Sequence, residues 1–204
     1  MGRGSEPRRV ALYGLVINFF LTGFKYLAGF FGRSSAMIAD ATHSLSDLLT
    51  DLVVFLGLFV AEKPADAHHP YGHGKVEAVL AAVCGLSLLF AAAAIFFSGV
   101  SSILSVFRGG AIESPGLSPL VAAFLSVVIK EWMFRYTIAK GRLFQSSALI
   151  AKAWDHRSDA LSSIGTLAGI GGAFFGGEKF RILDPIAAVT VSVFIVRAAL
   201  PILR

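Results

Sequence analysis

Cysteine and charge are both scarce in this sequence. Its 204 residues include a single cysteine, Cys84, and only 15% of them are charged, whereas 55% are hydrophobic. One cysteine excludes intramolecular disulfides and cysteine-rich metal sites. Soluble domains carry about 25% charged residues, so the composition excludes an ordinary cytosolic enzyme, a disordered regulator and a nucleic-acid-binding domain. The mean hydropathy of +0.73 instead predicts an integral membrane protein.

Six apolar runs in the sequence are each long enough to cross a bilayer. A helix needs about 20 residues to span an apolar core roughly 30 Å thick, and glycine, proline or charged residues separate the runs. We expect an all-α membrane protein with a short cytoplasmic segment at residues 1–9, a membrane domain at residues 10–204 and no cytosolic C-terminal domain. The six expected transmembrane helices are residues 10–31, 34–61, 76–105, 118–138, 147–175 and 183–203.

Basic residues are divided unequally between the two sides of the expected bundle. Cytoplasmic segments of membrane proteins collect Lys and Arg, so the net charge of +5 does not indicate a nucleic-acid partner. The side with fewer basic residues holds Arg33, Arg108, Lys179 and Arg181. The richer side holds Arg3, Arg8, Arg9, Lys63, Lys75, Arg135, Lys140, Arg142 and Arg204. We therefore expect both termini in the cytoplasm, which agrees with an even number of spans.

Acidic residues interrupt two of the expected spans. An aspartate at the centre of a membrane helix costs about 2.5–3.5 kcal/mol on insertion scales, so these side chains must face each other, water or a cation. Successive members are three or four residues apart, which places them along one face of each helix. They are Asp40, His43, Asp47 and Asp51 in the second span, and Asp155 and Asp159 in the fifth.

Two pairs at a spacing of four residues form a candidate metal site. Side chains one helical turn apart can reach a single ion, and His43 with Asp47, facing Asp155 with Asp159, supplies one nitrogen and three oxygen donors. Four such donors suffice for a tetrahedral site. The alternative is that these groups form a buried network that only locks the helices together.

The neighbouring polar residues allow several interpretations. Asp40 and Asp51 are either accessory acids near the metal, at its entrance or in water, or members of a buried network. His156 is an alternative to Asp155 as a ligand, because it lies three residues before Asp159. Long charged side chains near the ends of spans reach the interface or pair with an opposite charge. This applies to Lys25, Lys130, Glu131 and Arg197.

Three segments of the sequence resemble the cation diffusion facilitator family of metal exporters. They are Ala-Asp-Ala-Thr-His-Ser-Leu-Ser-Asp at residues 39–47, the histidine-rich loop at residues 64–77, and Trp-Asp-His-Arg-Ser-Asp-Ala-Leu-Ser-Ser at residues 154–163. The resemblance implies a secondary active transporter, not an enzyme, that exchanges a cytoplasmic divalent metal for protons. It also implies that the central metal site falls on His43, Asp47, Asp155 and Asp159.

Two departures from the family pattern bear on the ion and on assembly. Many members have histidine where this sequence has Asp155, and the acidic version resembles an uncommon branch that includes magnetosome-associated transporters. We expect zinc, with cadmium following it, because one imidazole and three carboxylates suit zinc; iron and manganese stay open. The family's cytosolic C-terminal domain, which holds a dimer together, is not expected here, so a homodimer follows from resemblance only.

The histidine-rich loop is a second candidate metal site. By resemblance a peripheral site falls on Asp66, His69 and His73, with His68 as an accessory residue. Histidines and a carboxylate within a few residues can bind a zinc-like ion. The alternative is that Pro70 and the neighbouring glycines shape a turn whose histidines contact lipid headgroups.

Metal binding is expected to be linked to protons. The ligands must be deprotonated to hold a metal, and a histidine with an ordinary pKa of about 6.5 changes charge near physiological pH. We expect metal and protons as the transported ions, the lipid bilayer as the environment, and a bacterial inner membrane as the location. The rivals are an ion channel that uses the same acids, and a non-transporting partner subunit or metal-sensing scaffold.

Overall fold

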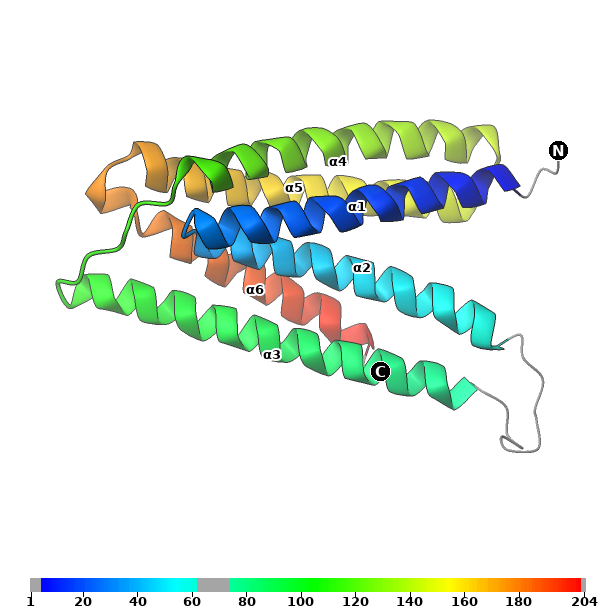
Figure 1. Cartoon of the computed structure of the whole chain (residues 1–204), viewed down its shortest axis with the longest axis horizontal. Helices are drawn as coiled ribbons and strands as arrows, with labels where there is room; N and C mark the ends of the chain where they lie inside the picture. Colours follow the sequence, from blue (N-terminus) through cyan, green and yellow to red (C-terminus); the bar gives the residue numbers. More distant parts are fainter. Residues whose placement is uncertain (1–4, 62–73, 203–204) are drawn as a thin grey trace.

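Helices make up nearly all of the computed structural model, which describes residues 5–61 and 74–202 (Figure 1). Within these ranges there are six long helices, one 3-10 turn and no strand. The helices are α1 (Ser5–Phe31), α2 (Ser35–Ala61), α3 (Gly74–Phe107), α4 (Leu117–Leu143), α5 (Ser147–Phe175) and α6 (Leu183–Ile202), with η1 at Glu178–Phe180. The predicted all-α fold with six helices is confirmed.

The helix bounds agree closely with the expected spans. The largest differences are in α1, which begins at Ser5 where residue 10 was expected, and in α4, which continues to Leu143 where the apolar run predicted an end at residue 138. Its last turn carries Lys140 and Arg142, and basic side chains are favourable there because the C-terminus of a helix carries partial negative charge. The two basic residues thus favour the longer helix.

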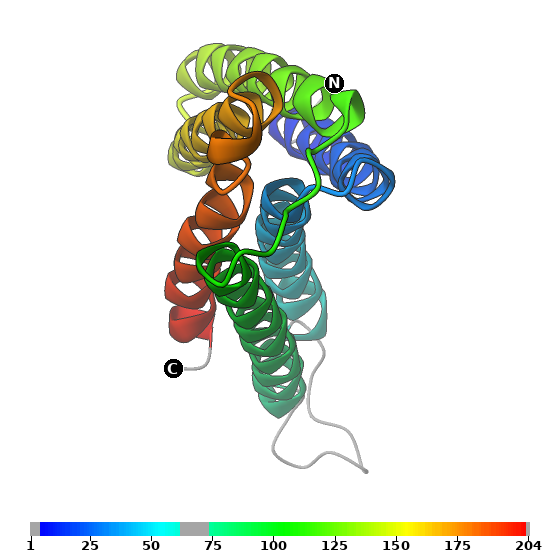
Figure 2. The same ribbon diagram turned by 90° about the vertical axis from the view of Figure 1, so that its left-hand side faces the viewer.

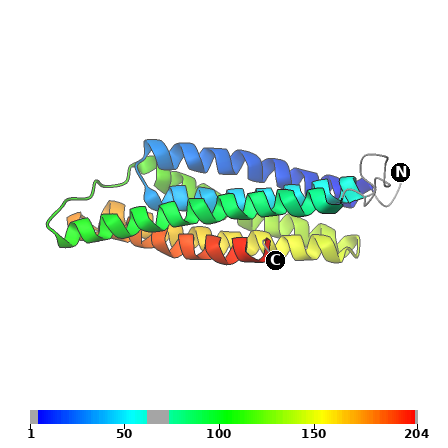
Figure 3. The ribbon, with the colours of Figure 1, turned by 90° about the horizontal axis from the view of Figure 1, so that it is seen from below.

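The helices lie roughly along one axis, as Figures 1 and 3 show. Viewed from the end (Figure 2), α4 and α5 pack side by side, α1 lies next to α4, and α2 occupies the middle between α1, α3 and α6. Helix α3 packs chiefly on α6. Helix α1 begins, and α6 ends, toward the same end of the bundle, as the even number of spans requires.

The outer surface of the bundle is apolar. Large side chains such as Phe31, Phe90, Phe107 and Phe175 are each at least 75% exposed, which is unfavourable in water and ordinary in lipid. Among the described residues, four segments are long and apolar enough to cross a membrane: Arg9–Phe31, Gly85–Phe107, Leu117–Leu143 and Glu178–Leu200. The remaining helices, α2 and α5, are the two that carry the acids of the candidate metal site. The protein is therefore an integral membrane protein.

Two helical hairpins in the fold repeat the same local sequence. Ser-Ser-Ala-Met-Ile-Ala opens α2 at residues 34–39, and Ser-Ser-Ala-Leu-Ile-Ala opens α5 at residues 146–151. Both are preceded by a residue of positive φ, Arg33 and Gln145, each at 52°. The turns lie at opposite ends of the bundle (Figure 1), so the α1–α2 and α4–α5 hairpins are related as an inverted repeat, an arrangement found in many transporters.

The inverted repeat places the two acidic motifs at matching positions. His43 and Asp47 follow Ser34 by the same numbers of residues as Asp155 and Asp159 follow Ser146. Because α2 and α5 start from opposite ends, equal distances along each helix bring both motifs to the middle of the bundle. The fold thereby places the candidate ligands at the depth where inverted-repeat transporters bind their substrates.

Candidate metal site

Three of the four predicted ligands come together between α2 and α5. One ligand atom each from His43, Asp47 and Asp159 lies within 4.8 Å of the others. The spacing of four residues aligns His43 and Asp47 on α2. Ser163 of α5 is fully buried and donates to Asp40 of α2 at 3.2 and 3.3 Å, which joins the two helices directly. One nitrogen and two carboxylates thus surround a space of the size that a metal ion needs.

Unpaired polar atoms mark the same place. Among the described residues, His43 Nδ1 and Asp47 Oδ2 are buried and have no hydrogen-bond partner. Most buried polar atoms in folded proteins do have a partner, because an unpaired one costs about 1–3 kcal/mol. Two of the three grouped residues therefore each have a buried polar atom that a cation would satisfy.

A lysine from α4 reaches the third ligand. Lys130 Nζ lies 2.6 Å from Asp159 Oδ2 and donates a second hydrogen bond to Asn18 Oδ1 on α1, at 2.7 Å. The Lys130 side chain is fully buried, so of the two explanations from sequence, pairing is confirmed and extension to the interface is wrong. No pattern in the sequence indicates this contact with Asp159, since the two residues lie on different helices.

Asp155 does not join the three-residue group. Its side chain is 66% exposed, and its nearest charged partner is Lys152, at 3.9 Å. The structure therefore brings together His43, Asp47 and Asp159, and leaves the predicted fourth ligand one helical turn away on α5. A direct role for Asp155 stays a prediction.

The accessory acids pair with lysines. Asp40 lies 2.7 Å from Lys25 Nζ, accepts hydrogen bonds from the Ser163 hydroxyl at 3.2 and 3.3 Å, and is 1% exposed. Of the interpretations offered by the sequence, membership of a buried network is the one observed for Asp40. Asp51 accepts hydrogen bonds from Lys152 Nζ with both carboxylate oxygens, at 2.6 Å each.

His156 lies on a different face of α5. It is 2% exposed, and its ring approaches Gly14 of α1, where an added Cβ would lie 3.5 Å from Nε2. His156 is not in the group formed by His43, Asp47 and Asp159, so the structure does not support it as a substitute for Asp155. The second candidate site, Asp66, His69 and His73 with His68 beside it, lies outside the described residues.

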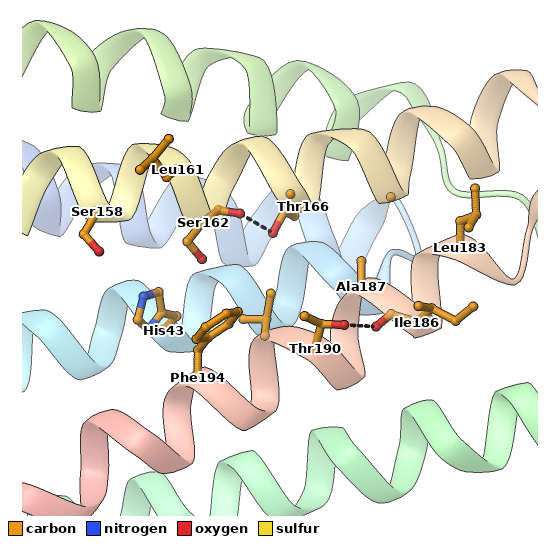
Figure 4. A pocket seen from close by; sticks show the side chains of 13 residues that line it. His43, Ser158, Leu161, Ser162, Thr166, Leu183, Ile186, Ala187, Thr190 and Phe194 are labelled. Carbon is orange, nitrogen blue, oxygen red and sulfur yellow. Dashed lines mark hydrogen bonds between the residues drawn. The ribbon is translucent and has the colours of Figure 1, made fainter.

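A cavity of about 560 Å³ leads to the site from one side. Figure 4 shows it running between α5 and α6, from His43 toward Leu183 at the start of α6. Hydroxyl groups of Ser158, Ser162 and Thr166 line its wall on α5. On the other side of the site, toward the end of the bundle where α5 begins, the Lys152–Asp51 pair joins α5 to α2. The site is thus reached from one end and bridged at the other.

The aspartate at the start of α6 holds this end of the cavity to α2. Asp184 accepts hydrogen bonds from Ser34 Oγ at 2.5 Å and from the Ser35 backbone N–H at 2.8 Å. The carboxylate therefore pairs with N–H groups at the N-terminus of α2, which have no partner within that helix.

Comparisons with known proteins agree with this architecture. Residues 11–204 match the family described as cation efflux transmembrane domain. The chain is 33% identical to the manganese efflux system protein MneP of Bacillus subtilis, with 99% of the chain and 68% of MneP covered. It is 35% identical to the magnetosome protein MamB of Magnetospira sp., covering 92% of the chain and 62% of MamB.

A plant relative extends the comparison. The chain is 34% identical to metal tolerance protein C1 of Arabidopsis thaliana, with 97% of the chain and 44% of that protein covered. The chain thus spans about two thirds or less of the length of these relatives. A match to a cation efflux transmembrane domain over nearly the whole chain, on a six-helix fold with a buried imidazole and carboxylate group, shows that the chain belongs to the cation diffusion facilitator family of membrane transporters.

Proposed function

We propose that this chain carries a divalent transition-metal ion out of the cytoplasm by binding it between α2 and α5. The observation that carries the proposal is the group of His43, Asp47 and Asp159, whose ligand atoms lie within 4.8 Å of one another. Two of these side chains have a buried atom without a hydrogen-bond partner. Imidazole and carboxylate together suit first-row transition metals and not Mg²⁺, which keeps its waters.

Zinc is the first candidate ion, as the donor types in the sequence favour it, and cadmium would follow zinc. Manganese is the second candidate, favoured by the name of the relative MneP and by a group with two carboxylates and one imidazole. Iron belongs to the same class of ions. Direct competition among Zn²⁺, Mn²⁺ and Fe²⁺ for the purified protein would rank them.

Proton exchange is the proposed driving force. A metal ion and protons compete for the same imidazole and carboxylates, so protons that arrive from the outer side would discharge the metal there. The cavity from His43 toward the start of α6 supports a route to one side. With both termini in the cytoplasm, as the basic residues predict, that route leads outward. We further propose a homodimer in a bacterial inner membrane.

Transport assays with site variants test the proposal. We expect proteoliposomes to accumulate Zn²⁺ or Mn²⁺ against its gradient when a pH gradient is imposed, and Asp47→Asn to abolish this flux because a carboxylate ligand is lost. Glu113→Gln is the matched control, since Glu113 pairs with Arg33 at an exposed position far from the site in the fold. Equal flux in wild type and Asp47→Asn would contradict the site.

The same assay separates the rival functions. Uphill accumulation excludes a channel, because a channel only dissipates a gradient. A partner subunit or metal-sensing scaffold would bind metal without flux, and it would leave an efflux-deficient host as metal-sensitive as before. Flux that ignores an imposed pH gradient would remove proton exchange while leaving metal export in place.

A further inference from the structure

A buried positive charge lies against one ligand of the candidate site. The Lys130 ammonium is 2.6 Å from Asp159 Oδ2, with the lysine side chain fully buried and that of Asp159 12% exposed. Asn18 holds the same ammonium from α1 at 2.7 Å. The ammonium is therefore fixed between three helices, α1, α4 and α5, and one of its contacts is to a carboxylate that a metal ion would also use.

A cation at this position is unexpected in a site for cations. Charges in a protein interior interact more strongly than charges in water, because the effective dielectric constant is lower. An ammonium beside Asp159 lowers the attraction of the site for a second positive ion. It also balances one carboxylate whenever no metal ion is bound, and an unbalanced buried carboxylate is costly.

The other buried lysine of this bundle has a different position. Lys25 pairs with Asp40 at 2.7 Å and donates to the hydroxyls of Ser44 and Ser163. Asp40 does not belong to the group of His43, Asp47 and Asp159. The Lys25 pair accounts for a structural connection between α1, α2 and α5, whereas the Lys130 pair includes a ligand atom of the site.

We propose that Lys130 determines the metal affinity of the site: its ammonium competes with the dication for Asp159 and keeps binding weak enough for release. This inference rests on the proposed function. A transporter needs a site that its ion can leave, so a positive charge next to a ligand serves transport even though it weakens binding. Asn18 is a positioning residue, since it holds the ammonium at Asp159.

Metal binding to the purified protein tests the proposal without measuring transport. Calorimetry with Zn²⁺ and with Mn²⁺, at one fixed pH in detergent, would compare wild type with Lys130→Met and Lys130→Arg. We expect Lys130→Met to bind on the order of tenfold more tightly or better, because a buried like charge is removed. Lys130→Arg keeps the charge and should stay near wild type.

A second variant covers the case in which Lys130→Met does not fold. Asn18→Asp leaves the lysine in place and gives its ammonium a competing carboxylate, so metal binding should again become tighter. Unchanged or weaker binding in Lys130→Met and Asn18→Asp, or in whichever of the two folds, would overturn the role of Lys130. If wild type itself binds neither ion, or if Asp47→Asn binds as well as wild type, the proposed function fails instead, and the two failures are thereby distinguished.

Discussion

At the scale of single residues, the described part of the chain contains two histidines that differ in what they face. His43 lines the cavity and approaches Asp47 and Asp159. His156 is 2% exposed and faces Gly14 on α1. In both rings Nδ1 has no hydrogen-bond partner among the described residues, so an unpaired nitrogen alone does not identify a ligand. Convergence with carboxylates does, because a metal ion needs several donors around one point.

The two histidines form a matched pair for mutation. We expect His43→Ala to weaken Zn²⁺ binding by at least about 100-fold, since changes in the outer partners of metal ligands alone cost 10–100-fold. His156→Ala should leave the affinity within a few-fold of wild type, although it removes a packed ring. Calorimetric titration of both purified variants checks this, and a larger loss in His156→Ala would show that the site lies elsewhere.

At the scale of helices, the turn between α1 and α2 fixes how α4 begins. A Cβ added at Gly32 would lie 2.2 Å from Pro119 Cδ, and the Gly116 backbone N–H donates to Gly32 O at 2.8 Å. The backbone of the turn therefore touches the first turn of α4 directly. This contact fixes the end of α1 against the start of α4, and it thereby helps to position Asn18 against Lys130 deeper in the bundle.

Adding a methyl group at this contact should destabilise the fold. We expect Gly32→Ala to lower the free energy of unfolding by about 1–3 kcal/mol, the usual cost of overfilling a packed contact. The control is Gly23→Ala within α1, where an added Cβ meets nothing within 4 Å. That change should be neutral or stabilise by up to about 1 kcal/mol. Thermal unfolding in detergent distinguishes the two, and equal effects would contradict the role of Gly32.

At the scale of the whole molecule, the inverted repeat pairs contacts on the two sides of the site. Asp40 lies as many residues after Ser34 as Lys152 lies after Ser146. In the same way, Asp51 of α2 corresponds to Ser163 of α5. The repeat therefore relates the contact between Asp40 and Ser163 to the contact between Lys152 and Asp51, and the structure contains both. Each joins α2 to α5. The halves nevertheless differ, since only the side toward α6 opens into the described cavity.

Accessibility from one side follows from this asymmetry. In a chain whose single cysteine is replaced, Cys84→Ser, a membrane-impermeant thiol reagent should label Ser162→Cys from the side opposite the termini. Bound Zn²⁺ or Mn²⁺ should slow the reaction, because Ser162 lines the cavity that leads to His43. The control is Ser126→Cys on α4, whose serine is fully buried away from that cavity. Labelling of Ser162→Cys from the side of the termini alone would contradict the assigned route.

The sequence alone determined the helices and the face on which His43 and Asp47 lie. Apolar length and a spacing of four residues are local properties of one chain segment, so they can be read without knowing the fold. The tertiary structure decided which helices meet and at what height. It placed Lys130 on Asp159, paired Asp40 with Lys25, and left Asp155 exposed. Contacts of this kind depend on how separate helices cross, and no spacing within one helix specifies that.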